Sequence, residues 1–155
     1  MVGRPHPGSE RPLHGPLQAF DLEVEAARLR EENERREGRR NSITLRKGGG
    51  LNVVLLAMKA GDRLEEHSAP GPIALSVREG RIRFTAEGEA ALEAGPETML
   101  ACDARVRHAV EALSDAVCLI SVATGGRGWK SMSGRRPRYG RISKRWSPWP
   151  RGGRG

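Results

Sequence analysis

The chain has 155 residues and 37% hydrophobic residues, enough for one domain with a core of its own. Its formal net charge of +8 is uneven, because residues 125–155 carry ten of the 27 basic residues and none of the 19 acidic ones, so residues 1–124 are close to neutral. The longest apolar run, residues 53–58, is far shorter than the roughly 20 residues that cross a bilayer, which excludes a membrane-spanning helix. Two cysteines make no disulfide framework and no apolar signal segment opens the sequence, so we expect a cytoplasmic protein.

The first 38 residues divide into an arm and a helix. Residues 1–19 are rich in Pro and Gly and poor in large apolar groups, so we expect a flexible arm. Residues 20–38 predict a helix, because Asp21 can cap its start and Leu22 and Leu29 share one face at helical spacing. The narrow apolar stripe indicates that this helix packs on a neighbour through its first half.

Residues 42–124 change to short alternating segments, which predict a β domain. The turns between the segments contain Gly, Pro, Asp or Ser, the residues that turn geometry favours. Eight or nine short strands with no intervening helix indicate an antiparallel sandwich or barrel. The expected strands are 41–47, 51–59, 63–67, 73–78, 81–86, 90–93, 98–102, 106–113 and 116–123. Residues 125–155 lack this alternation, and we expect a disordered basic tail there.

Two motifs within residues 60–123 carry a family resemblance. In the first, Gly61, His67 and Gly80 follow the spacing Gly, five residues, His-x-His, Glu and Gly, with Ala69 and Ile73 at the second His and the Glu. In the second, the motif residues present are Gly95, Leu100, Asp103, Ala104, Val106 and His108. The segment resembles the small single-domain cupins, which implies an all-β jelly-roll barrel after the short N-terminal helix. Arg105 and Arg107 stand where that pattern has Gly and Pro, and a positive φ at Arg105 would be strained.

The cupin resemblance also implies a metal site, because three His and one Glu at the motif positions bind a divalent transition metal in that family. This chain keeps only His67 and His108. Strand parity places His67 on the same side as Arg63 and Glu65, so Glu65 is a candidate replacement carboxylate. The alternative is that both histidines are hydrogen-bonded groups lining a mostly apolar pocket, which Ile73 makes drier.

Three functions remain open at this level. The first is a small-molecule-binding cupin domain with His67, His108, Ile73 and Glu65 in the barrel interior, with or without a weak metal site and with no assignable reaction. The second is a nucleic-acid-associated protein, because basic residues interleaved with Trp can hold phosphates and stack on bases. Its candidate contacts are Arg135, Arg136, Arg138, Lys144, Arg145, Trp146 and Trp149. The third is a structural homodimer that pairs through an edge within residues 43–56.

Overall fold

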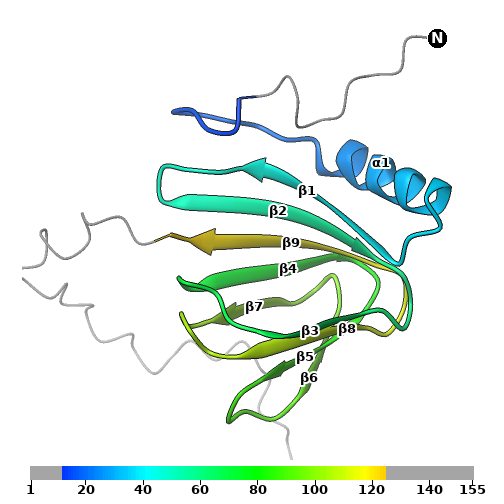
Figure 1. The fold of residues 1–155 in the computed structure, drawn as a ribbon, viewed down its shortest axis with the longest axis vertical. Coiled ribbons are helices and arrows are strands. Elements are labelled where there is room, and N and C mark those ends of the chain that lie inside the picture. Colours follow the sequence, from blue (N-terminus) through cyan, green and yellow to red (C-terminus); the bar gives the residue numbers. More distant parts are fainter. Residues whose placement is uncertain (1–11, 125–155) are drawn as a thin grey trace, which may run out of the picture.

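The computed structural model describes residues 12–124, which form one helix and nine antiparallel strands (Figure 1). The elements are α1 (Leu22–Arg35), β1 (Arg40–Arg46), β2 (Leu51–Met58), β3 (Arg63–His67), β4 (Ile73–Glu79), β5 (Ile82–Ala86), β6 (Leu92–Ala94), β7 (Met99–Cys102), β8 (His108–Ala112) and β9 (Ala116–Ala123). They build a five-stranded sheet in the order β1-β2-β9-β4-β7 and a four-stranded sheet in the order β3-β8-β5-β6. The predicted all-β fold with a short N-terminal helix is confirmed.

The strands form one long hairpin that is rolled up. Strand β5 pairs with β6, β4 with β7, β3 with β8 and β2 with β9, so the two arms of the hairpin pair from the β5–β6 turn outward. Two further pairings, β4 with β9 and β5 with β8, join turns of the roll, and the pairing of β1 with β2 adds the outer strand of the larger sheet. This nested pairing is the jelly-roll arrangement. It places the β5–β6 turn, the tip of the hairpin, at one end of the domain.

The main core lies between the two sheets. Alternate residues of β4 and β5 point inward, and Leu75, Val77, Ile82 and Phe84 are each at most 5% exposed. Full burial of a side chain of this size contributes about 1.5–3 kcal/mol, so the inner faces supply much of the stability. The period of two that the sequence shows therefore identifies the core-facing positions.

Helix α1 covers the outer face of the larger sheet. Asp21 accepts a hydrogen bond from the backbone N–H of Val24 at 3.1 Å and so caps the helix start. Ala26 and Leu29 are buried in a second apolar cluster with side chains of β1, β2 and β9, and Figure 1 shows the helix beside β1. The domain is therefore three layers deep on this side, with the helix outside the larger sheet.

Gly80 makes the tight turn between β4 and β5. Its φ is +75°, a conformation that glycine adopts without a steric penalty. A methyl group at this position would lie 2.0 Å from the carbonyl oxygen of Asp115, just before β9. The turn thus needs glycine both for its backbone conformation and for the close approach of another chain segment.

The residues before α1 contact the β1–β2 turn. Residues 12–19 form neither helix nor strand, but the Leu13 carbonyl accepts from Lys47 N–H at 2.8 Å and the Gly15 carbonyl accepts from Arg46 Nη1 at 3.1 Å. The rest of the predicted arm, residues 1–11, and the predicted tail, residues 125–155, lie outside the described residues. Across residues 12–124, no helix has the length and apolar character needed to span a membrane.

Candidate functional site

The two motif histidines lie next to each other on paired strands. His67 ends β3 and His108 begins β8, and the two residues are directly opposite in the register of these strands. Their ring centroids are 4.4 Å apart with an interplanar angle of 62°. His108 is only 4% exposed and His67 is exposed, so the pair runs from the barrel interior to its surface. Folding thus brings together two residues that are 41 positions apart in sequence.

Backbone hydrogen bonds fix the tautomer of both rings. Nδ1 of His67 lies 2.8 Å from the Glu65 carbonyl oxygen, and Nδ1 of His108 lies 3.0 Å from the Val106 carbonyl oxygen. A carbonyl oxygen can only accept, so each Nδ1 must carry a proton and donate it. In the neutral rings Nε2 then keeps its lone pair. The pair therefore offers two acceptor nitrogens held in a fixed orientation.

The parity expected for β3 is wrong because the strand contains a register shift. Arg63 pairs with Glu111 and Leu64 pairs with Val110, but the next pair is His67 with His108. This irregularity puts His67 on the same face of the sheet as Leu64 and His108 instead of on the face of Arg63. Glu65 is exposed, and its contact with His67 is made through the backbone carbonyl rather than the carboxylate. Glu65 is therefore not positioned as a replacement ligand.

The donor set does not fit a resident catalytic metal. Ala69 and Ile73 occupy the positions where the motif has the other two ligands, and neither side chain can coordinate a metal. Ile73 is 6% exposed and lies on β4, in the sheet opposite the histidines. Within residues 12–124 there is no cluster of three or more His, Cys, Asp or Glu side chains arranged to bind a metal ion. Catalytic metals usually need three protein ligands, so two imidazoles leave such a site incomplete.

The turn before His108 adopts the conformation that the motif implies. Arg105 has φ +66°, in the region where glycine is favoured. Its backbone N–H donates to the Ala69 carbonyl at 2.9 Å, which ties this turn to the segment after His67. The backbone geometry of the motif is thus retained although the glycine is not, at the strain expected for Arg105.

A cavity of about 570 Å³ opens between the last strands of the two sheets, β6 and β7. Its apolar wall comes from β5, β6, β7 and the turn before β8. The residues are Phe84, Ala86, Leu92, Leu100, Cys102 and Val106. Neither His67 nor His108 is part of the wall, but the ring of Phe84 stacks on His108 at a centroid distance of 5.5 Å and an angle of 13°. Phe84 is therefore the contact between the cavity and the histidine pair.

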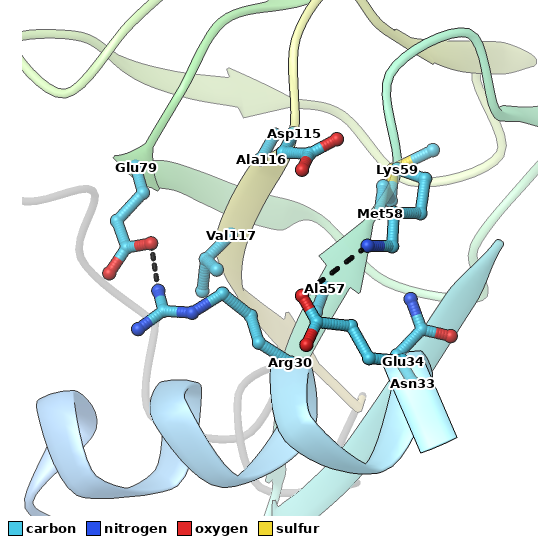
Figure 2. Close-up of a pocket in the computed structure, with 10 residues that line it drawn as sticks. All are labelled: Arg30, Asn33, Glu34, Ala57, Met58, Lys59, Glu79, Asp115, Ala116 and Val117. Carbon is cyan, nitrogen blue, oxygen red and sulfur yellow. Dashed lines mark hydrogen bonds and ion pairs between the residues drawn. The ribbon is translucent and has the colours of Figure 1, made fainter. Parts of the chain in front are cut away.

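A second, smaller pocket lies beneath α1. Figure 2 shows it between the helix and the ends of β2 and β9, with the ion pair of Arg30 and Glu79 on one side and that of Lys59 and Glu34 on the other. Its volume is about 50 Å³, which holds a few water molecules. The pocket is too small for an organic ligand, and its charged residues join the helix to the sheet.

The two thiols occupy different positions relative to the cavity. Burial raises the pKa of Cys118 to about 11, and this residue is 0% exposed in the core. Cys102 is partly exposed on the cavity wall, and its pKa is raised by desolvation and by the negative charge of Asp103. Both thiols are therefore poor nucleophiles at neutral pH.

The sequence predicted an apolar pocket at His67, His108, Ile73 and Glu65, but none of these four residues lines the cavity. Its wall uses ordinary apolar strand residues, and its rim uses the acidic β5–β6 turn, which reads in sequence as a solvated loop. The cluster of Glu87 and Glu89 at the tip of a hairpin was the available signal.

The proposed nucleic-acid contacts from Arg135 to Trp149 lie outside the described residues, and that hypothesis stays a prediction. For the dimer hypothesis, β1 is an outer strand while β2 is paired on both sides, so only part of segment 43–56 forms an edge.

Nested strand pairing, the two motif turns and the facing histidines define the cupin fold for residues 40–123. Similar solved structures include a cupin superfamily protein from Desulfitobacterium hafniense DCB-2, with 17% identity over 56% of this chain and 78% of that chain and a TM-score of 0.53. An RmlC-like cupin from Desulfovibrio desulfuricans shows 23% identity over 73% of this chain and 96% of that chain, with a TM-score of 0.51. A DMSP lyase from Ruegeria pomeroyi DSS-3 shows 18% identity over 59% of this chain and 50% of that chain, with a TM-score of 0.53.

These similarities establish the fold and leave the activity open, because one fold carries many functions. No protein-family model and no curated protein sequence matches this chain.

Proposed function

We propose that this chain binds a small organic molecule in the cavity between β6 and β7, with Phe84 and the His67–His108 pair forming its inner support. The observation that carries the proposal is an apolar cavity of about 570 Å³ in which the aromatic wall residue Phe84 is stacked on a buried histidine. Ligand sites in proteins are commonly about 300–1,000 Å³, mostly apolar and equipped with a few polar groups. No reaction is assigned, since the cavity-lining residues within 12–124 form no nucleophile–base pair.

The histidine pair acts on the ligand through Phe84 in this proposal. The backbone carbonyls hold both imidazoles, and the stack on His108 then fixes the plane of the Phe84 ring. A fixed aromatic surface loses little conformational freedom when a ligand packs on it, which favours binding. His108 is therefore a positioning residue for the cavity wall.

Titration of the full chain with phenylbutanol, a neutral probe, tests the cavity by nuclear magnetic resonance. We expect saturable shifts of Phe84 and Leu100 signals in the original chain. Ala91 lines the cavity and is exposed, so Ala91→Trp should fill the space and weaken probe binding at least tenfold. Ala60→Trp adds the same side chain at an exposed turn away from the cavity and should leave binding unchanged. Absence of saturable binding to the original chain would refute the proposal.

Metal content separates this function from the version with a weak divalent metal site. We expect less than one equivalent of transition metal in the full chain purified without chelators, because the site offers two imidazoles from residues 12–124 where a catalytic metal usually needs three protein ligands. Stoichiometric metal that disappears in His108→Ala and stays in His14→Ala would instead establish a metal held by the histidine pair. His14 is a suitable control because it lies beside the β1–β2 turn.

A further inference from the structure

The charged residues around the cavity indicate the class of ligand that the cavity would accept. Three carboxylates, Glu87, Glu89 and Asp103, line the cavity together with its apolar wall. All three residues are exposed, so they stand at the opening. No Lys or Arg is among the residues that line the cavity within the described part of the chain. The opening therefore carries three negative charges above an apolar interior.

Within residues 12–124, the basic residues near this opening do not form ion pairs with the three carboxylates. Arg107 is ion-paired with Glu66 at 2.6 Å, and its backbone carbonyl accepts from Glu87 N–H at 2.8 Å. Arg105 is exposed and is not part of the cavity wall. None of the three rim carboxylates has a Lys, Arg or His nitrogen within 4.0 Å inside residues 12–124.

The thiol of Cys102, on the cavity wall, is influenced by one of the three carboxylates, that of Asp103. Asp103 raises the pKa of Cys102, after the larger effect of desolvation, because a nearby negative charge opposes formation of the thiolate. An anionic group that enters the cavity would meet the same repulsion, and a cationic group would be attracted.

We propose that the cavity selects an organic cation, with the apolar part of the ligand against Phe84 and Leu100 and its positive group between Glu87, Glu89 and Asp103. This inference rests on the proposed function and adds the charge of the ligand to it. Exposed charges interact weakly one by one, so the selectivity comes from three carboxylates acting on one cation. The preference should decrease at high salt, because the rim is open to solvent.

Three probes that share one carbon skeleton test the charge: phenylbutylammonium, phenylbutanol and phenylbutyrate. We expect the ammonium probe to bind the full chain about tenfold more tightly than the alcohol, which corresponds to about 1.4 kcal/mol, and the carboxylate probe to bind weakest. Equal affinity for the ammonium and alcohol probes would overturn the inference and leave the proposed function standing. If none of the three probes binds, the proposed function fails as well.

Removal of the rim charges is the second arm. The triple variant with Glu87→Gln, Glu89→Gln and Asp103→Asn should bind the ammonium and alcohol probes equally, because only the charges are lost. The control variant carries three substitutions on α1 that change the net charge by the same amount, Glu23→Gln, Glu31→Gln and Glu34→Gln. It should keep the tenfold preference for the ammonium probe. If both triple variants lose the preference alike, net charge and not the rim is responsible, and the inference is wrong.

The same cationic chemistry can come from the chain itself, because residues 125–155 contain ten basic and no acidic residues. A synthetic peptide of residues 134–149 added to the full chain distinguishes the two sources. Displacement of phenylbutylammonium from the original chain, absent with the rim variant, would identify the peptide segment as a competing cation. Unchanged affinity in excess peptide would assign the cavity to free organic cations.

Discussion

Replacement of Gly80 by alanine should destabilise the domain far more than its size suggests. The residue has φ +75°, and an added methyl group would lie 2.0 Å from the Asp115 carbonyl oxygen. Carbon–oxygen contacts are normally no closer than about 3.3 Å, so the two segments must separate by about 1.3 Å. Asp115 leads directly into β9, which is paired on both sides by β2 and β4, so the shift cannot be absorbed at an edge.

Gly88 provides a matched control, because its φ is +78° and no atom of residues 12–124 lies within 4 Å of the position of an added methyl group. Alanine in this conformation costs roughly 1–2 kcal/mol, partly offset by about 0.4–1 kcal/mol from the stiffer unfolded chain. We therefore expect Gly88→Ala to lower the free energy of unfolding by about 1 kcal/mol. The steric shift adds about 1–3 kcal/mol at Gly80, so Gly80→Ala should lose about 2–4 kcal/mol.

Urea unfolding of both variants, followed by circular dichroism, measures the difference. The original chain gives the reference, and equal slopes of the transitions would show that compactness is unchanged. The reasoning is refuted if the two alanine variants unfold within about 0.5 kcal/mol of each other, because the close approach to Asp115 would then cost nothing beyond the backbone conformation.

Two further predictions concern single residues of the motif and the core. Arg105→Gly should raise the free energy of unfolding by about 0.5–1 kcal/mol, because glycine removes the conformational cost of φ +66° but adds conformational freedom to the unfolded chain. A loss of stability in the same urea assay would contradict this prediction. The pKa of the Cys118 thiol is about 11 in the folded chain and near 9.0 in the unfolded chain. The contribution of the protonated thiol to the free energy of unfolding is therefore complete below pH 9 and is lost as the pH rises toward 11. At pH 10 the loss should be about 1.4 kcal/mol relative to Cys118→Ala, and parallel pH profiles of the two chains would exclude it.

The fold was predictable because strand periodicity and turn residues agree along residues 42–124. Every expected strand has a counterpart, and the spacing from Gly61 to Gly80 places the first motif on β3, β4 and the turn after them. Arg105 has a positive φ, which is the condition under which strain was expected at this position. These features depend on residues that are close together in the sequence, so short sequence segments are sufficient to predict them.

The site was less predictable because it depends on long-range geometry. The register shift in β3 changed the face of His67, and a shift of one position leaves no mark on the local pattern of polar and apolar residues. The cavity depends on which strands end the two sheets, and its wall combines Phe84, Leu100 and Val106 from separate parts of the chain. These side chains come together only when the hairpin rolls up, so the local sequence around each one does not show that they share a cavity.

The position of the cavity beside the hairpin tip has a consequence for how such a barrel diversifies. The β5–β6 connection is exposed from Glu87 to Ala91, and strand pairing begins on either side of it. Surface connections tolerate insertions better than paired strands do. Lengthening this one connection or changing its residues would alter the opening of the cavity while the paired strands keep their register. Ligand recognition can therefore change while the fold stays the same.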